Sequence, residues 1–360
     1  MADRGRIVVL PGDGIGPEVT AAAHRVLQTV AGKAGLGLDF EEDLVGGASV
    51  DAYGVALRPE TLKRCKSADA ILFGAVGGPK WDDASPQSEK RPGTAILGLR
   101  KGLGLFANLR PVRVDPSMAS SSVLQPDRVR GVDIMIVREL TGGLYFSKPK
   151  RRYETPRGMA AVDTMRYSEP EIERVAVKAF ELAQRRRGKL CSVDKANVLE
   201  TSRLWRVVVS QLGKRYPDVE LSHMLVDAFA MDVLRRPQAF DVVVTENLFG
   251  DVLTDEASML AGALGMLPSA SLGTGTLGLY EPIHGSAPDI AGKDIANPIG
   301  AILSAAMLLR WSLNRDDLAQ QIERAVSDAL ASGLRTADIA GANPAVGTRT
   351  MAEAVITALS

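Results

Sequence analysis

The chain has 360 residues, 46% of them hydrophobic and 24% charged, a composition typical of a soluble globular protein with room for two domain-sized cores. Lysine plus arginine and aspartate plus glutamate each number 43, so the formal net charge is zero and no whole-chain positive field exists to hold a nucleic acid or an anionic membrane. Two cysteines, Cys65 and Cys191, are too few for a disulfide framework, and we expect both to be buried thiols in a reducing, cytoplasmic setting.

Short apolar runs alternate along the chain with longer segments of helical period. We predict strands at 7–10, 70–73, 133–137, 190–193, 219–226 and 241–245, and helices at 18–31, 169–187, 200–214, 248–262, 318–331 and 349–359. The first strand follows the N-terminus without a charged-then-apolar leader, which fits a cytoplasmic location. The alternation predicts an α/β fold with a mainly parallel sheet.

Two segments depart from this alternation. In residues 141–166 we expect Gly142 and Gly143 to turn a hairpin, which a strongly basic run then follows. Such an arm cannot bury a face alone, so a role between subunits and a purely local role are both open. Residues 257–280 carry no charge, but Pro268 and many small residues favour a buried helix leading into a loop over a membrane span.

Asp251 and Asp255 lie four residues apart in a segment of helical period. This spacing places both carboxylates on one helix face, where their repulsion would be offset by a divalent cation. Carboxylate oxygens without a nearby His or Cys cluster suit Mg²⁺ or Mn²⁺ better than zinc. Two solvated acids near a helix start are the alternative.

Three arginines, Arg100, Arg110 and Arg138, occur in similar apolar settings, and Arg138 ends a predicted strand. A guanidinium in such a place binds a carboxylate well through two parallel hydrogen bonds. For each arginine alone, a structural ion pair is the simpler explanation. If the fold brings the three into one cleft, they predict an acidic substrate.

Polar side chains also follow other predicted strands. Lys195 comes after the strand at 190–193, Asp227 ends the strand at 219–226, and Tyr145 follows Arg138 closely. The ends of parallel strands are where α/β folds place reactive groups, although each residue alone could be core filler or surface charge.

Two small-residue loops are candidates for ligand contact. The loop at 11–18 is glycine-rich but lacks the dinucleotide-binding spacing, so a structural turn and a phosphate contact are equally open. The loop at 284–289, with Asn297 beyond it, could wrap an adenosine, and Asp289 could accept hydrogen bonds from its ribose. We interpret His24, in a helix, and His223, in a strand, as structural.

Taken together these motifs resemble the β-decarboxylating dehydrogenases, the family of isocitrate and isopropylmalate dehydrogenases, over nearly the whole chain. The resemblance depends on eight stretches: 12–18, 77–82, 99–101, 105–111, 138–146, 194–199, 246–255 and 281–289. It implies a two-domain α/β fold unlike the Rossmann fold, with a discontinuous cofactor-binding domain at 1–105 plus 263–360. The segment 106–262 would bind substrate and metal and form an intertwined homodimer, with the arm at about 141–166.

The resemblance also implies residue roles. Arg100, Arg110 and Arg138 would bind a 2-hydroxy diacid, and Asp251, Asp255 and Asp227 would hold Mg²⁺ or Mn²⁺. Asp227 would also contact the substrate and, with the proton-accepting Lys195, would come from the partner subunit, so that the dimer shares its active sites. Tyr145 would be the acid of the final step after oxidation and loss of CO2. The residues that would contact NAD are His284, Gly285, Ser286, Ala287, Asp289, Ile290 and Asn297.

Ile96, four residues before Arg100, matches the family position that faces the substituent at C3. An apolar side chain there fits an isopropyl group, whereas isocitrate enzymes resemble one another in using a polar hydroxyl residue nearby. Gly93 departs from the pattern, because many isopropylmalate enzymes carry Glu there, and it weakens the assignment of the nicotinamide position. Tartrate, malate or homoisocitrate as substrate, and a catalytically silent regulatory subunit of the same fold, are the alternatives.

Overall fold

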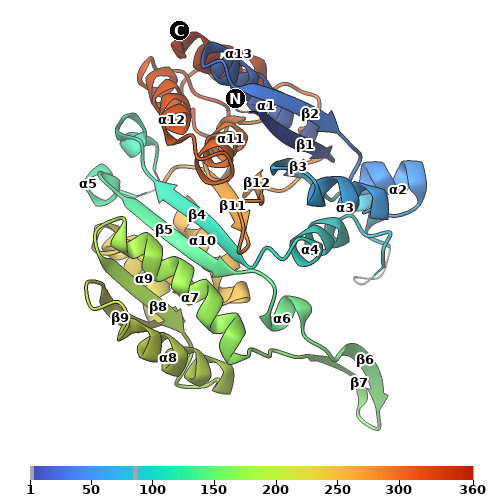
Figure 1. Ribbon diagram of the computed structural model, residues 1–360, viewed down its shortest axis with the longest axis vertical. Helices are drawn as coiled ribbons and strands as arrows, with labels where there is room; N and C mark the ends of the chain where they lie inside the picture. The colour runs from blue at the N-terminus through green and yellow to red at the C-terminus, as the bar shows by residue number, and fades with distance from the viewer. Residues whose placement is uncertain (1–3, 84–87, 123, 360) are drawn as a thin grey trace. The chain divides into compact units, whose positions relative to one another are not determined.

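The computed structural model describes residues 4–83, 88–122 and 124–359, and the chain divides into two compact units (Figure 1). The first unit contains Met1–Leu105, Val114–Arg130 and Ser258–Ser360, and the second contains Phe106–Arg113 and Gly131–Ala257. Relative to the expected segments, residues 114–130 and 258–262 group with the first unit. The cofactor-binding and substrate-binding roles expected of the two domains stay predictions.

The strands of the first unit lie in the order β2-β1-β3-β12-β11. Neighbours are parallel except for β11 and β12, which form an antiparallel pair. Every residue of β3 is buried, as expected for a central strand covered on both faces. The bounds are β1 Arg4–Gly12, β2 Gly37–Glu42, β3 Ala70–Ala75, β11 Pro268–Leu272 and β12 Gly278–Pro282.

The helices of the first unit cover this part of the sheet. Helix α1 starts with a proline at its first turn, where the missing N–H costs nothing, and packs on β1 and β3. Helix α11 carries no charge before Arg310 and packs on β11 and β12. The bounds are α1 Gly16–Lys33, α2 Gly47–Tyr53, α3 Pro59–Lys66, α4 Gly93–Gly102, α5 Pro126–Val129, α11 Ile299–Trp311, α12 Asp316–Ala331 and α13 Thr348–Ala358.

The strands of the second unit lie in the order β4-β5-β10-β8-β9, with β4 antiparallel to β5 and the remaining neighbours parallel. Parallel pairing brings the carboxyl ends of β5, β10 and β8 to one edge, and antiparallel pairing places Asn108 of β4 opposite Arg138 of β5. The bounds are β4 Ala107–Arg113, β5 Asp133–Glu139, β8 Lys189–Asp194, β9 Glu220–Leu225 and β10 Val242–Thr245.

Five helices belong wholly or mostly to the second unit. Helix α7 begins at a capping box, in which Ser168 and Glu171 bond each other's backbone N–H groups, and it packs against β5, β10 and β8. The bounds are α6 Gly143–Phe146, α7 Glu169–Gln184, α8 Glu200–Gly213, α9 Val226–Arg235 and α10 Asn247–Ser258. The predicted α/β architecture with a mainly parallel sheet is confirmed.

Several local predictions are wrong. Gly142 and Gly143 do not turn a hairpin but lead into α6, while the arm is the antiparallel pair β6 (Lys150–Thr155) and β7 (Gly158–Asp163), whose turn follows Thr155. The small-residue loop expected before Tyr280 contains β11 and the start of β12. Asp227 lies in the first turn of α9, two residues after Leu225, the last paired residue of β9.

Both cysteines are buried, as expected, and burial raises the pKa of the Cys65 thiol to about 12 and that of Cys191 to about 11. His24 lies in α1 against the ring of Phe40, and His223 lies in β9, where it pairs with Ser210. Within residues 4–83, 88–122 and 124–359, no helix is both long enough and apolar enough to cross a bilayer.

Candidate active site

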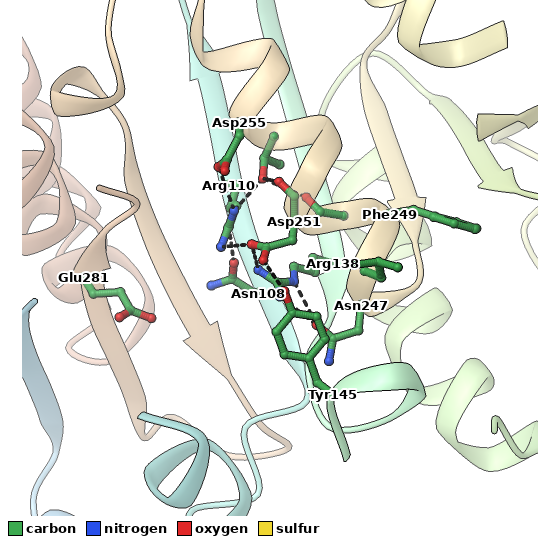
Figure 2. A network of polar contacts seen from close by, with 12 residues as sticks. Asn108, Arg110, Arg138, Tyr145, Asn247, Phe249, Asp251, Asp255 and Glu281 are labelled. Carbon is green, nitrogen blue, oxygen red and sulfur yellow. Dashed lines mark hydrogen bonds and ion pairs between the residues drawn. The ribbon is translucent and has the colours of Figure 1, made fainter. Parts of the chain in front are cut away.

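Asp251, in the first half of α10, is the centre of a polar cluster in the second unit (Figure 2). Arg138 and the Tyr145 hydroxyl both donate hydrogen bonds to its carboxylate, and Arg110 Nη2 lies 3.3 Å from its Oδ1. The structure therefore brings together four of the predicted site residues, which come from β4, β5, α6 and α10.

The two guanidinium groups of this cluster are deeply buried, Arg138 being 2% exposed and Arg110 6%. Asn247 Oδ1 accepts hydrogen bonds from Arg138 Nε at 3.0 Å and from Nη2 at 2.8 Å. Buried cations must be paired and hydrogen-bonded, so these contacts and Asp251 offset the loss of hydration. The arrangement leaves Arg138 fixed in direction.

Arg110 is held in the same way by neutral oxygens. Its Nε donates to Asn108 Oδ1 at 2.6 Å and its Nη1 to Thr254 Oγ1 at 2.5 Å. Asn108, Thr254 and Asn247 are site residues that were not predicted from the sequence. The signal for Asn108 was available, because residues two apart on a strand share a face, so the asparagine two before Arg110 had to lie beside it.

Asp255 lies one helical turn after Asp251, with its Oδ1 3.9 Å from Arg110 Nη1. Burial raises the pKa of Asp255, while Arg110 opposes the rise. The alternative of two solvated acids is wrong for Asp251, which is paired with two guanidinium groups. Two carboxylates on one helix face fit a hard cation such as Mg²⁺ or Mn²⁺ in donor type.

One copy of the chain does not complete a metal site within the part that the structure describes. Those residues contain no group of three His, Cys, Asp or Glu side chains able to hold a metal. Asp227 instead forms an ion pair with Lys195, whose Nζ lies 2.5 Å from Asp227 Oδ1. The hydrogen bond from Lys195 lowers the pKa of Asp227. The structure thus pairs these two residues with each other and not with Asp251 or Asp255.

Tyr145 contributes a phenol to the cluster. Its ring lies under the guanidinium of Arg138, with 5.2 Å from Cζ to the ring centroid. Burial and the hydrogen bond to Asp251 raise the pKa of Tyr145, so the hydroxyl keeps its proton at neutral pH. A protonated phenol held by a carboxylate and beside a guanidinium can donate a proton to a substrate.

Arg100 and Ile96 lie in the first unit, one turn apart on α4. Arg100 is buried and its Nη2 donates to Glu281 at 2.8 Å, while its buried Nε has no hydrogen-bond partner among the described residues. Ile96 is half-buried against the apolar core of this unit. A buried Nε without a hydrogen-bond acceptor is consistent with a guanidinium that binds an anionic ligand.

The loop after β12 contains most of the predicted NAD contacts. His284 Nδ1 pairs with Gly285 O at 2.9 Å, and its Nε2 is buried without a partner in the described chain. Burial lowers the pKa of His284, so the ring is neutral at pH 7. A neutral imidazole with an unused nitrogen fits a nucleotide base as hydrogen-bond partner.

The rest of this loop is held by the glycine-rich turn after β1. Ser286 O accepts a hydrogen bond from Ile15 N at 2.8 Å, and a Cβ on Gly14, whose φ is +59°, would lie 1.9 Å from that oxygen. The turn therefore supports the loop through its backbone. Ala287 has a φ of 36°, and Gly285 and Asp289 are exposed while Ile290 is half-buried.

Asn297 is fixed by protein contacts on both sides of its amide. Its Nδ2 donates to Asp338 at 3.0 Å and its Oδ1 accepts from Ile299 N at 3.0 Å, at the start of α11. The side chain is 5% exposed. The assignment of Asn297 and of the 284–290 loop to NAD stays a prediction.

The chain is similar to known dehydrogenases over almost its full length. The model of the isocitrate/isopropylmalate dehydrogenase family matches residues 6–355. The chain belongs to this family. A 3-isopropylmalate dehydrogenase of Anaeromyxobacter dehalogenans is 59% identical over 99% of both chains, and one of Gloeobacter violaceus is 56% identical over 99% of both.

Solved structures agree with the family assignment. An isocitrate dehydrogenase of Methylococcus capsulatus superimposes with a TM-score of 0.88 at 34% identity, covering 99% of both chains. A β-decarboxylating dehydrogenase of Thermococcus kodakarensis gives 0.78 at 37% identity, covering 99% of this chain and 96% of that one. The expected two-domain dehydrogenase fold, distinct from a Rossmann fold, is confirmed.

Proposed function

We propose that this protein is an enzyme of leucine biosynthesis that uses NAD to oxidise and decarboxylate (2R,3S)-3-isopropylmalate, giving 4-methyl-2-oxopentanoate and CO2. The observation that carries the proposal is the similarity, at 54–59% identity over nearly the full chain, to eight relatives named 3-isopropylmalate dehydrogenase. The isocitrate dehydrogenase that superimposes well is more distant, at 34% identity.

Substrate binding is assigned to the arginines. Arg110 and Arg138 are buried, and side-chain oxygens fix the orientation of their guanidinium groups. Both are paired with Asp251, and a substrate carboxylate would replace part of this ion pairing. Arg100 would bind the second carboxylate through its fork, and Ile96, one turn earlier on α4, would contact the isopropyl group.

Asp251 and Asp255 of one chain, with Asp227 of a second copy, would hold Mg²⁺ or Mn²⁺. When bound, the cation would supply a Lewis acid for negative charge on the substrate oxygens, and NAD would supply the hydride acceptor. The chain's own groups move the protons. Lys195 of the second copy accepts the hydroxyl proton, and Tyr145, which keeps its proton at neutral pH, delivers one to C3.

NAD is assigned to the loop after β12, with His284, Gly285, Ser286, Ala287, Asp289, Ile290 and Asn297 in contact. The buried, unpartnered His284 Nε2 supports this assignment. Asp289 is exposed, and its carboxylate would accept hydrogen bonds from the ribose hydroxyls. Its negative charge would favour NAD over a phosphorylated cofactor.

A homodimer with shared active sites is part of the proposal. The second unit exposes large apolar side chains on α8, α9 and α10, including Val207 at 50%, Met231 at 67% and Val252 at 60%. The β6–β7 arm exposes most of both its faces, and a two-stranded ribbon is marginal alone. A second copy of the chain would cover both surfaces and would bring its Lys195 and Asp227. A cytoplasmic location fits this biosynthetic role.

The test is an assay of NADH formation by the purified protein with Mg²⁺ and a panel of 2-hydroxy diacids. The proposal predicts that isopropylmalate gives the highest kcat/KM, above malate, tartrate, isocitrate and homoisocitrate. A faster rate on any other diacid would contradict the substrate assignment. An absence of NADH with every substrate would favour a silent regulatory subunit.

A further inference from the structure

Two buried glutamates and a tyrosine join the segments that carry the site residues of the second unit. Glu139 is fully buried, Glu246 is 4% exposed and Tyr167 is 6% exposed. Tyr167 Oη lies 3.3 Å from Glu139 Oε2, 3.2 Å from Glu246 Oε2 and 3.0 Å from the backbone nitrogen of Asn247. None of the three residues has a role in the reaction proposed above.

Each glutamate also fixes the backbone next to a site residue. Glu139 follows Arg138 on β5, and its carboxylate accepts from the N–H groups of Thr141 and Gly142, both at 2.8 Å, in the turn that leads to Tyr145. Because these contacts and the Tyr167 hydroxyl converge on one carboxylate, the end of β5 and the start of α6 are held as one piece.

Glu246 does the same at the start of α10. Its carboxylate accepts from Leu248 N at 3.0 Å and from Phe249 N at 2.8 Å, which satisfies two of the free N–H groups of the first turn. The next residue, Asn247, carries the side-chain oxygen that holds Arg138. Tyr167 thus accepts a hydrogen bond from Asn247, the residue whose side chain orients the Arg138 guanidinium.

The ring of Tyr167 packs tightly against the turn before Tyr145. A Cβ on Gly142 would lie 2.6 Å from Tyr167 Cε1, and one on Gly143, whose φ is +65°, would lie 2.4 Å from Tyr167 Oη. Only glycine permits this approach at both positions. The turn and the tyrosine therefore fit one another closely.

The hydrogen bonds around the Tyr167 hydroxyl require a proton on one of the two glutamates. A phenol has one proton to donate and an oxygen that accepts, and the Asn247 N–H already occupies one accepting direction. The hydroxyl can donate its proton to one glutamate only. The second glutamate must therefore carry a proton that it donates to the phenol oxygen, because two oxygens that face each other in a buried site without a proton between them are destabilising.

The surroundings favour one shared proton. Burial raises the pKa of both Glu139 and Glu246. The charged groups that face them are Arg174 of α7, 3.6 Å from Glu139 Oε1, Arg138 of β5, and Asp194 of β8, which lines the same space as Glu246. Two like charges bridged by one hydroxyl repel each other, so the pair titrates as a unit.

We propose that Tyr167 is a positioning residue, which sets Arg138, Tyr145 and the start of α10 relative to one another through Glu139 and Glu246, and that these two glutamates share one carboxyl proton. The substrate readout below rests on the proposed isopropylmalate activity. The other two readouts do not depend on any activity.

The first experiment compares Tyr167→Phe with Tyr280→Phe. Tyr280 is a matched control, because it is fully buried and its hydroxyl bonds Ser312 at 2.7 Å, outside the cluster. Both variants lose one buried hydroxyl, but Tyr167→Phe should lose more stability because it also leaves the Asn247 N–H without its partner, whereas Ser312 keeps its hydrogen bond to Thr276 O. Hydrogen exchange should rise in peptides covering 139–146 and 246–251 for Tyr167→Phe only. Equal exchange in these peptides for both variants would overturn the positioning role.

Steady-state kinetics separate an effect on substrate binding from an effect on NAD binding. For Tyr167→Phe we expect KM for isopropylmalate to rise about 10-fold, the effect of one lost hydrogen bond to a group that directs a charged side chain, with KM for NAD within about twofold. For Tyr280→Phe neither should change. Equal rises in both KM values for Tyr167→Phe would contradict the role. Glu139→Gln, which keeps the shape and removes the charge, is the second variant if Tyr167→Phe does not fold.

Infrared spectroscopy in D2O at neutral pH tests the shared proton. The unaltered protein should show the C=O stretch of a protonated carboxylic acid that is lost in Glu139→Gln and also in Glu246→Gln, because either amide replaces the proton donor and leaves the other glutamate ionised. A spectrum unchanged in both variants would overturn the sharing. If the unaltered protein does not oxidise isopropylmalate, the proposed function fails, while exchange and infrared spectra still decide this proposal.

Discussion

Among the single residues, Asp251 lies where the positive and negative charges of the cluster balance. Arg110 and Arg138 contribute two positive charges to the cluster, and Asp251 and Asp255 contribute two negative charges. A dianionic substrate and a divalent cation would add equal and opposite charges, so the complex would keep the same balance. Buried charges are tolerated only when compensated in this way. The cluster is therefore suited to bind the substrate and the cation together.

Ile96 is the residue that we expect to select the substrate. Ile96→Ser should lower kcat/KM for isopropylmalate by about 10- to 200-fold, the range for a lost apolar contact in a pocket. Activity on malate, which lacks the isopropyl group, should change little. Steady-state kinetics on both substrates checks this, with Ile96→Val as a mild control. An equal loss on both would mean that Ile96 supports the fold only.

Asp289 is the residue that we expect to exclude NADP. A carboxylate about 4 Å from a 2′-phosphate costs roughly 1 kcal/mol in water and about 4 kcal/mol at a surface-like dielectric, which predicts a preference for NAD of about 10- to 1000-fold. Replacing Asp289 with Lys and Ile290 with Tyr should move the preference toward NADP, whereas Asp289→Ala should mainly weaken NAD. Comparable kcat/KM for the two cofactors in the unaltered enzyme would refute the assignment.

At the scale of elements, helix α4 carries the departure from the family pattern. Gly93 is its first residue, is exposed, and a Cβ there would meet no atom within 4 Å. Nothing in the packing of the described residues therefore requires glycine. A glutamate would add helix propensity and place a negative charge in the first turn, where the helix dipole favours it.

Gly93→Glu should therefore stabilise the protein by about 0.5–1.5 kcal/mol, the sum of these two effects. If the side chain also orients the nicotinamide, KM for NAD should fall. Denaturant unfolding and initial rates measure the two effects separately. Gly93→Ala is the matched control, because it adds propensity without charge. Destabilisation by both substitutions would show that the backbone there needs glycine.

Elements with a clear hydrophobic period could be predicted from the sequence, and others could not. Helix α10 and strand β5 were predicted, together with Asp251 and Arg138, because apolar residues recur at the right spacing. Strands β11 and β12 were missed because Ser269, Ser271 and Gly278 fill positions that usually hold large apolar residues. A strand built from small residues gives no periodic signal.

The site was only partly predictable for a related reason. The acids, arginines and tyrosine were visible as residue types at strand ends, whereas Asn247 and Glu139 act through contacts with residues far along the chain. Two adjacent glycines usually make a hairpin turn, and for that reason the sequence predicts one at Gly142 and Gly143. The contact with Tyr167, more than twenty residues later, explains them, and no local pattern contains it.

At the scale of the whole molecule, the separation of Lys195 and Asp227 from the Asp251 cluster predicts shared sites. Tyr145→Phe and Lys195→Met should each lower kcat by about 10²-fold or more, as expected for positioned acid and base groups. Refolding the two variants together should give heterodimers with one intact site and restore up to about a quarter of the unaltered activity. The absence of recovery, with heterodimers shown to form, would place both residues in the same subunit's site.

The proposed reaction couples oxidation at C2 to loss of the carboxylate at C3. The most direct measurement uses 3-isopropylmalate labelled with ¹³C in the carboxylate at C3, with NAD, Mg²⁺ and the purified protein. We predict one labelled CO2 for each NADH and unlabelled 4-methyl-2-oxopentanoate as the organic product, detected by mass spectrometry. NADH formation with the label retained in the organic product would show that oxidation and decarboxylation are not coupled.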